Sequence, residues 1–268
     1  MGTASVDTVI PTAVLPVSAP LRVRDRLRAA PDGPVRTLHR GRHAVYVEIS
    51  GGCVGVVARG AVPVPCALRT TLESFAPPGP ERAYLRGGVL HLDGQPLVVG
   101  RVVDVHVARL AARGLPPADS TTAVVIPPAA VVEFVAGTGL PARLGPGALV
   151  RWLPALIGRG EGLTPLGDDL VCGWLGAHRA AGTATPDVDR AVRAQMPRTT
   201  PLSAELLDCA LHGEVLPQFA AYLPALGTPA EPAAAAALIA VGHTSGAGLL
   251  HGARLALAVL AHPIGAVA

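Results

Sequence analysis

The feature that most constrains the fold is a change in hydrophobic pattern near residue 125. Before it, short apolar runs are separated by Gly51-Gly52 and Asp93-Gly94, dipeptides typical of tight turns between strands. After it, alanine and leucine recur at helical spacing, in segments bounded by Gly or Pro. The sequence therefore predicts an α+β chain, with a β-rich N-terminal half, as an antiparallel sheet or small barrel, followed by an all-helical C-terminal bundle.

This pattern predicts three parts. Residues 1–34, rich in Pro and Arg, form an irregular N-terminal arm with a short helix near 21–30. Residues 35–125 form the β-rich domain, whose last strand includes 103–107, where valines alternate with polar residues. Residues 126–268 form the helical domain. Its expected helical segments are 129–137, 147–158, 168–182, 202–223, 231–242 and 247–262.

Composition excludes several classes of function. Half of the residues are hydrophobic and 15% are charged, which is typical of a globular chain. The formal charge is only +3 and the arginines are scattered, so no nucleic-acid partner is expected. The chain contains no lysine, which excludes Schiff-base chemistry and a phosphate-binding loop built on Gly-Lys-Ser/Thr.

Cysteine spacing and the termini indicate the compartment. Four cysteines lie far apart with no Cys-x-x-Cys pair to bind zinc, as expected of buried thiols in a reducing environment. The N-terminus lacks the features of a secretory signal, and no apolar run approaches the ~20 residues that span a bilayer. We therefore expect a cytoplasmic protein with no membrane partner.

Three expected helix starts in the C-terminal half share one chemistry. The first is GRGEGLTPLGDD (158–169), with Thr164 as N-cap and Pro165 at the first helical position. The second is RTTPLS (198–203) and the third is GHTSG (242–246). Unpaired N–H groups at a helix N-terminus bind anions, and glycines upstream let a ligand approach the backbone. The candidate residues for binding a small anionic substrate are Gly160, Gly162, Thr164, Arg198, Thr199, Thr200, Ser203, Thr244, Ser245 and Gly246.

Three further residues are candidates for catalysis. Asp168 and Asp169 are expected about 100° apart on their helix, so one would turn inward as a base or metal ligand while the other caps or pairs with an arginine. Both could instead simply complement the helix dipole. His243 lies in a glycine-bounded loop and is a candidate general acid or base, with a structural role as the alternative. No cofactor is expected; Mg²⁺ at the aspartates stays open.

These three blocks resemble a known bacterial family. GRGEGLTPLGDDLVCGWLGA, RTTPLSAELLDCALHGEV and GHTSGAGLLHGARLAL are similar to the three conserved blocks of the AllH family, which includes a subunit of oxamate carbamoyltransferase. The similarity covers roughly residues 150–260. Leu166 departs from the family pattern, which usually has Ser there, and Ala247-Gly248 stands where a larger or acidic residue is frequent.

The resemblance implies a transferase role. It implies a subunit of a carbamoyltransferase that acts in purine (allantoin) catabolism, with carbamoyl phosphate and oxamate as substrates. It also implies AllG-like and FdrA-like companion subunits. The alternative is a non-catalytic subunit whose glycines let helices and partner chains pack closely. Nucleotide binding at the glycine block is disfavoured, because 147–158 reads as a helix rather than the strand such a site needs.

Overall fold

The computed structural model describes residues 14–76, 79–110 and 128–261. The chain divides into two compact units. One comprises residues 1–61 and 67–103, and the other comprises Val62–Cys66 together with residues 104–268. The chain thus passes from one unit to the other three times. The expected boundary near residue 125 therefore differs from the observed one at 103/104.

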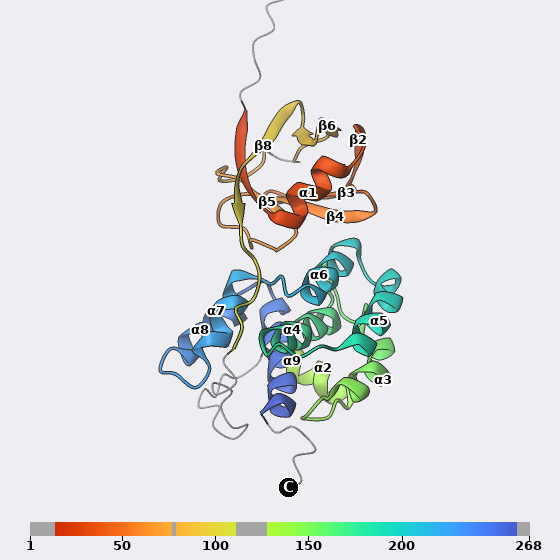
Figure 1. Ribbon diagram of the computed structural model, residues 1–268, viewed down its shortest axis with the longest axis vertical. Coiled ribbons are helices and arrows are strands. Elements are labelled where there is room, and N and C mark those ends of the chain that lie inside the picture. The colour runs from red at the N-terminus through yellow and green to blue at the C-terminus, as the bar shows by residue number, and fades with distance from the viewer. Residues whose placement is uncertain (1–13, 77–78, 111–127, 262–268) are drawn as a thin grey trace, which may run out of the picture. The chain divides into compact units, whose positions relative to one another are not determined.

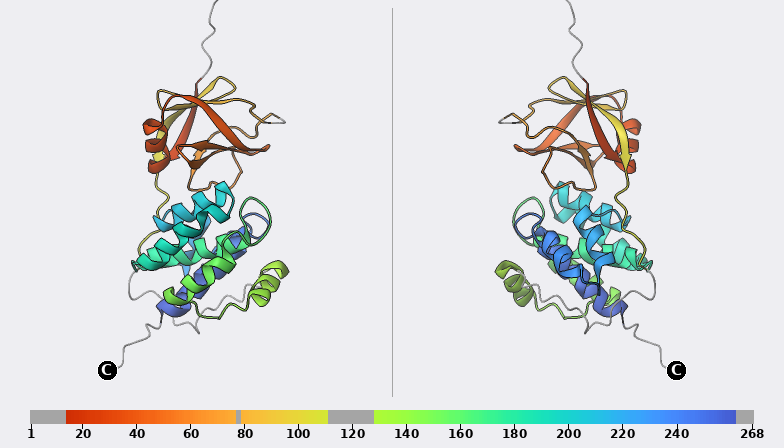
Figure 2. Two further views of the ribbon diagram at one scale, coloured as in Figure 1. Left: turned by 90° about the vertical axis from the view of Figure 1, so that its right-hand side faces the viewer. Right: turned by 90° about the vertical axis from the view of Figure 1, so that its left-hand side faces the viewer.

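The first unit is a closed barrel of eight strands (Figures 1 and 2). Neighbouring strands follow the order β1-β5-β4-β3-β2-β6-β7-β8, and β8 closes on β1. The small-barrel alternative of the sequence prediction is confirmed. Two pairs, β1 with β8 and β4 with β5, run parallel, so the barrel is mixed rather than purely antiparallel. The strands are β1 Leu15–Pro20, β2 Gly33–Arg40, β3 Ala44–Ile49, β4 Gly52–Val57, β5 Ala67–Arg69, β6 Ala83–Arg86, β7 Val89–Leu92 and β8 Gln95–Val103.

Local sequence explains most of the barrel's turns. β3 and β4 meet at a turn where Ser50 and Gly51 both adopt positive φ, and β7 and β8 meet at Asp93-Gly94, again with positive φ at both positions. Positive φ at both central residues suits the twist of a two-residue hairpin. Both hairpins predicted from glycine dipeptides are present. Buried Val, Leu and Ile side chains fill the barrel interior, as the alternating pattern requires.

The N-terminal segment is more ordered than predicted. Helix α1 (Leu21–Ala29) matches the short helix expected there, with Val23 and Leu27 packed into the barrel core. Strand β1 precedes it and pairs with β8, so residues 15–34 belong to the barrel rather than to an irregular arm. Residues 1–13 of the predicted arm lie outside the described part. The strand predicted across 103–107 ends at Val103, and only His106 continues as an isolated bridge, to Glu214.

The second unit is helical, as predicted. Helix α4 lies at its centre and packs along α9, with α6 against another face of α4 (Figure 1). Trp174 of α4 is fully buried and donates to the Leu144 carbonyl. No helix in the described ranges is long and apolar enough to cross a membrane. The helices are α2 Ala129–Thr138, α3 Pro146–Leu156, α4 Leu166–Ala180, α5 Pro186–Gln195, the 3₁₀ helix η2 Met196–Arg198, α6 Pro201–Leu211, α7 Pro217–Ala225, α8 Glu231–Ile239 and α9 Ser245–Leu260.

Two helical details differ from the sequence expectation. Helix α5 was not predicted, although Pro186 at its first position, acidic residues in its first turn and the buried pair Val188 and Val192 signal it. The segment 202–223, expected as one stretch, is two helices. α6 ends at Leu211, and Gly213 with a positive φ turns the chain before α7 begins at Pro217.

Candidate functional site

The glycine loop between α3 and α4 makes close backbone contacts of its own. Gly158, Gly160 and Gly162 all have positive φ. A side chain at Gly158 would collide with the Arg198 carbonyl, and a Cβ at Gly160 would lie 2.5 Å from the Leu166 nitrogen. Gly162 is exposed and faces open space. At the first two positions the chain's own backbone therefore requires glycine, rather than the approach of a ligand expected from the sequence pattern.

Helix α4 begins one residue later than predicted. Its first residue is Leu166 and its N-cap is Pro165, whose extended ψ of 138° sets it outside the helix. Pro165 therefore does not occupy the first helical position, and Thr164 is not the N-cap. The Thr164 hydroxyl instead lies 2.9 Å from the Ser245 hydroxyl. This contact joins the first predicted loop directly to the third.

Asp168 joins the first predicted loop to the second. Its carboxylate is fully buried and accepts hydrogen bonds from the Gly158 N–H (2.8 Å), the Ser203 hydroxyl (2.7 Å) and the Thr199 hydroxyl. Burial raises the pKa of Asp168 above its ordinary value, while these three hydrogen bonds lower it. The carboxylate thus serves as an internal anion that gathers donors from both loops.

Asp169 faces the third loop. It is 4% exposed, and its Oδ2 has no hydrogen-bond partner in the described part of the chain. Burial raises the pKa of Asp169 well above its ordinary value, a hydrogen bond from Ser245 lowers it, and the charge of Asp168 raises it further. If Ser245 donates to Asp169, then Thr164 donates to Ser245, which gives a continuous hydrogen-bonded chain from the first loop to this carboxyl. A carboxyl with so raised a pKa holds its proton more readily than an ordinary aspartate.

The second loop is held by its threonines. Thr200 is the N-cap of α6, as predicted: its side chain accepts from the Ser203 N–H at 3.1 Å, and Pro201 takes the first helical position. The Thr200 hydroxyl also donates to the Leu163 carbonyl at 2.5 Å. The Arg198 guanidinium is directed elsewhere, to the Pro154 carbonyl and the Gln195 side chain. Arg198 thus contributes its backbone, rather than its charge, to the loop cluster.

The third loop presents one exposed and one buried end. His243 is exposed, and Thr244 and Ser245 are half-buried at the start of α9. Gly246 is buried where a side chain would collide with the Leu238 carbonyl, so it serves the packing of α8 on α9. Thr244 is the N-cap of α9 but makes no side-chain capping bond.

The three predicted loops therefore converge. Hydrogen bonds connect eight residues of the three loops and the helices that follow them, and we call this set the loop cluster: Gly158, Thr164, Asp168, Asp169, Thr199, Thr200, Ser203 and Ser245. The aspartates are both buried, and neither forms an ion pair with an arginine of the described segments. Gly160, Gly162, His243 and Thr244 flank the cluster in sequence, whereas Gly246 and the Arg198 side chain are engaged in packing and in other contacts.

Sequence reasoning missed the glycines on which the aspartates depend. Gly248 of α9 lies against Asp169, where a Cβ would come within 2.9 Å of the Asp169 Cβ. Gly252, one turn further along α9, and Gly173 of α4 each face a backbone carbonyl of the opposite helix. The four-residue spacing of Gly248 and Gly252, which puts both on one helix face, is the signal that could have revealed this contact.

Two further titratable side chains of α4 are buried and structural. Cys172 is buried, and burial raises the pKa of its thiol well above the ordinary value, so it is protonated and unreactive, as expected. His178 stacks on Trp174 with 3.6 Å between ring centroids, and burial lowers its pKa to about 4. Within the described residues, no group of three or more His, Cys, Asp or Glu side chains is placed to hold a metal ion.

Comparison with known proteins finds one family for the segment that carries these loops. Residues 156–257 match a family model described as oxamate carbamoyltransferase subunit AllH. No curated protein and no solved structure matches the chain. The matched segment runs from the end of α3 into α9 and includes all three loops. The part of this chain that carries the loop cluster, residues 156–257, is therefore similar to the AllH family of oxamate carbamoyltransferase subunits.

Proposed function

We propose that this chain is a subunit of an oxamate carbamoyltransferase-like enzyme of purine (allantoin) catabolism, and that the loop cluster binds a small anionic substrate beside it. The observation that carries the proposal is the convergence of three separate loops of the family segment on two buried carboxyls. Such convergence of polar groups with shifted pKa values is typical of functional sites.

The arrangement divides the donors into two sets. Asp168 already occupies the Gly158 N–H and the hydroxyls of Thr199 and Ser203. The oxygens of a substrate would therefore bind at the solvent side, to the exposed backbone of Gly160 and Gly162 and to the Thr244 hydroxyl. Asp168 in this scheme fixes the loops rather than touching the anion.

Protonation of Asp169 would reduce the electrostatic repulsion between the loop cluster and a bound anion. Two ionised carboxylates would repel phosphate or oxamate, but the raised pKa of Asp169 favours its neutral form. A neutral carboxyl also donates a hydrogen bond to an oxyanion. We assign this donor role to the Asp169 Oδ2, which has no hydrogen-bond partner among the residues that the structure describes.

The proposed reaction transfers a carbamoyl group between two substrates that are both anions. The amide nitrogen of oxamate attacks the carbamoyl carbon of carbamoyl phosphate, the carbon–oxygen bond to phosphate breaks, and the proton lost from nitrogen leaves on the phosphate. The products are oxalurate and hydrogen phosphate. The exposed His243 is our candidate for carrying that proton. Holding the two anions in register supplies much of the acceleration in such a transfer.

We propose companion subunits of the AllG-like and FdrA-like kinds, since the matched family is described as a subunit. A second candidate function is a non-catalytic, packing subunit. It is favoured by Gly158, Gly160 and Gly246, whose missing side chains make room for the chain's own backbone. The two candidates differ in whether the loops that Asp168 holds together bind a substrate.

The test is phosphate and oxalurate release from carbamoyl phosphate and oxamate, with this chain alone and with its companion subunits. Asp168→Asn is the informative variant, because the retained amide oxygen still accepts from Gly158 while the new NH₂ donates to the Thr199 and Ser203 hydroxyls. Loop geometry is thereby kept and the charge is removed. His243→Ala is paired with His212→Ala, another exposed histidine at the end of α6, as matched control.

For the enzymatic role, we expect His243→Ala to lower turnover by about 100-fold or more, the usual scale for a proton-transfer group, while His212→Ala leaves turnover unchanged. Asp168→Asn, a positioning change, should raise KM more than it lowers kcat. All variants should still assemble with the companion subunits. Loss of assembly with turnover retained per assembled complex would support the packing role instead.

A further inference from the structure

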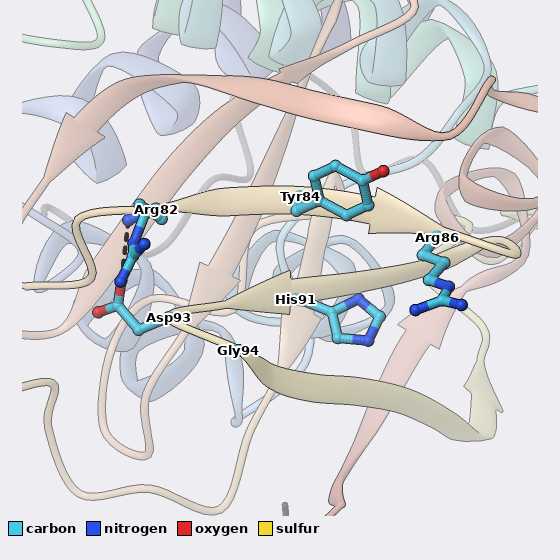
Figure 3. Close-up of a pocket in the computed structure, with 6 residues that line it drawn as sticks. All are labelled: Arg82, Tyr84, Arg86, His91, Asp93 and Gly94. Carbon is cyan, nitrogen blue, oxygen red and sulfur yellow. Dashed lines mark hydrogen bonds between the residues drawn. The ribbon is translucent and has the colours of Figure 1, made fainter.

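The outer face of the barrel carries a second polar site, independent of the loop cluster. Along β6, Ala83 and Leu85 point into the barrel core, whereas Tyr84 and Arg86 point outward in alternation, as does Arg82 just before the strand. These outward side chains line a surface cavity of about 380 Å³ together with His91, Asp93 and Gly94 (Figure 3). A cavity of this size falls within the range of small-molecule sites.

Strand register places the two ring side chains of the cavity, Tyr84 and His91, in one row with prolines of the neighbouring strands. Tyr84 is paired with His91 of β7 on one side and with Pro34 of β2 on the other, and His91 is paired in turn with Pro96 of β8. Paired residues have Cβ atoms about 5 Å apart. Pro34, Tyr84, His91 and Pro96 therefore form a continuous line of ring side chains over four neighbouring strands.

The exposure of Tyr84 distinguishes it within this chain. The sequence has three tyrosines. Tyr46 is 8% exposed and Tyr222 is fully buried, whereas Tyr84 is 44% exposed. In a chain with 3% aromatic residues, an exposed ring beside two arginines is the feature that a stacking ligand would use.

The hairpin that carries the site is held rigidly. Gly87 and Gly88 form its turn with positive φ at both positions, and the Gly87 N–H donates to Asp32 at 2.7 Å. A Cβ at Gly88 would lie 3.0 Å from the Arg28 Cα, so the turn packs directly on the end of α1. A rigid platform loses little entropy when a ligand binds.

The two ends of the row differ in charge: a carboxylate lies near one arginine, and the other arginine has no acidic partner in the part of the chain that the structure describes. The Asp93 carboxylate accepts from the N–H groups of Glu81 and Arg82, so it lies at the Arg82 end (Figure 3). Arg86, at the opposite end, has no ion pair with any residue in the described ranges. His91 donates from Nδ1 to the Val89 carbonyl if that nitrogen carries the proton, which leaves Nε2 to face a ligand. The end near Arg86 is therefore the cationic one.

We propose that this cavity binds a nucleoside monophosphate, with the base stacked on Tyr84 and the phosphate held by Arg86. Tyr84 and Arg86 are two residues apart on one strand face, which corresponds to about 6.6 Å. That spacing suits a ring and an anionic group joined by a sugar. The guanidinium of Arg86 binds phosphate through a fork of N–H donors, and the tyrosine ring accepts any base because every base has a flat face.

The test is calorimetric titration of the full chain with AMP, with adenosine, inorganic phosphate and a single-stranded oligoadenylate as separate arms. We expect saturable AMP binding that weakens about tenfold in Arg86→Gln and in Tyr84→Leu, as removal of one charged contact or one stacked base implies. Arg101→Gln, at an exposed arginine of β8 outside the cavity, is the matched control and should bind AMP as the unmodified chain does.

Four results would overturn the proposal. These are no saturable AMP binding, equal effects of Arg86→Gln and Arg101→Gln, inorganic phosphate binding as tightly as AMP, and oligoadenylate binding more tightly per site than AMP. The last would identify a single-stranded nucleic-acid surface. Far-ultraviolet circular dichroism of each variant verifies that the barrel is folded, so a loss of binding is not a loss of fold.

Discussion

Replacing Gly173 by alanine should disrupt the crossing of α4 and α9. Gly173 faces the Leu249 carbonyl, and its counterpart Gly252 faces the Leu170 carbonyl, so the two helices approach backbone to backbone. An added methyl group at Gly173 would overlap the Leu249 carbonyl. Because that obstacle is backbone, no side-chain rotation relieves the overlap, and the helices must move apart.

The magnitude follows from two opposing effects. Overpacking a core costs about 1–3 kcal/mol, and an obstacle made of backbone belongs at the upper end of that range. Alanine in place of a helical glycine returns about 1 kcal/mol. The net loss in the free energy of unfolding is therefore about 2 kcal/mol, equivalent to a decrease in Tm of about 4–8 °C for a chain of this size.

Urea and thermal unfolding, followed by circular dichroism, measure this loss. Gly137→Ala is the matched control, because Gly137 lies in α2, is exposed, and has no atom of the described chain within 4 Å of its Cβ position. The control should gain about 0.5–1 kcal/mol, since it keeps the helix propensity without the clash. Equal gains in both variants would refute the close crossing of α4 and α9.

Two further predictions concern the loop cluster. Burial raises the folded-state pKa of Asp169 above its unfolded-state value of about 3.9. The contribution of Asp169 to the free energy of unfolding is therefore fully present below about pH 3.9 and is lost as pH rises through the raised pKa. In urea unfolding, the stability of Asp169→Asn relative to the unmodified chain should therefore increase as pH rises from 4.5 to 8. A difference that stays constant across that range would contradict the raised pKa. Thr200→Ala should lose about 1 kcal/mol because it removes the N-cap bond to the Ser203 N–H. Thr244→Ala, at an N-cap with no such bond, is its control, and equal losses in thermal unfolding would argue against capping by Thr200.

Sequence predicted the fold best where local chemistry decides it. The turns at Gly51 and Asp93-Gly94 need positive φ, and the Thr200-Pro201 cap needs a hydroxyl followed by a residue without an N–H. Each of these follows from the residues involved. The closure of β1 onto β8 was not predictable in this way, because it depends on contacts between strands far apart in the chain.

For the loop cluster as well, one part could be predicted from local sequence and another could not. Its location was predictable, because Gly, Thr and Asp at helix starts carry a local signal. Its internal roles were not. That Asp168 takes the donors expected for a substrate, and that Arg198 turns to Pro154, depends on the tertiary arrangement of α3, α4 and α6.

The membership of Val62–Cys66 has a consequence for dissecting this protein. This five-residue stretch comes from the middle of the barrel's sequence, yet it packs with the helices, where Cys66 hydrogen-bonds to Cys209 of α6. A fragment starting at residue 104 would omit this stretch, and the Cys209 thiol would lose its hydrogen-bond partner Cys66. A truncated helical unit should therefore be designed with residues 62–66 added back. During synthesis, these residues of the helical unit emerge before the last four strands of the barrel.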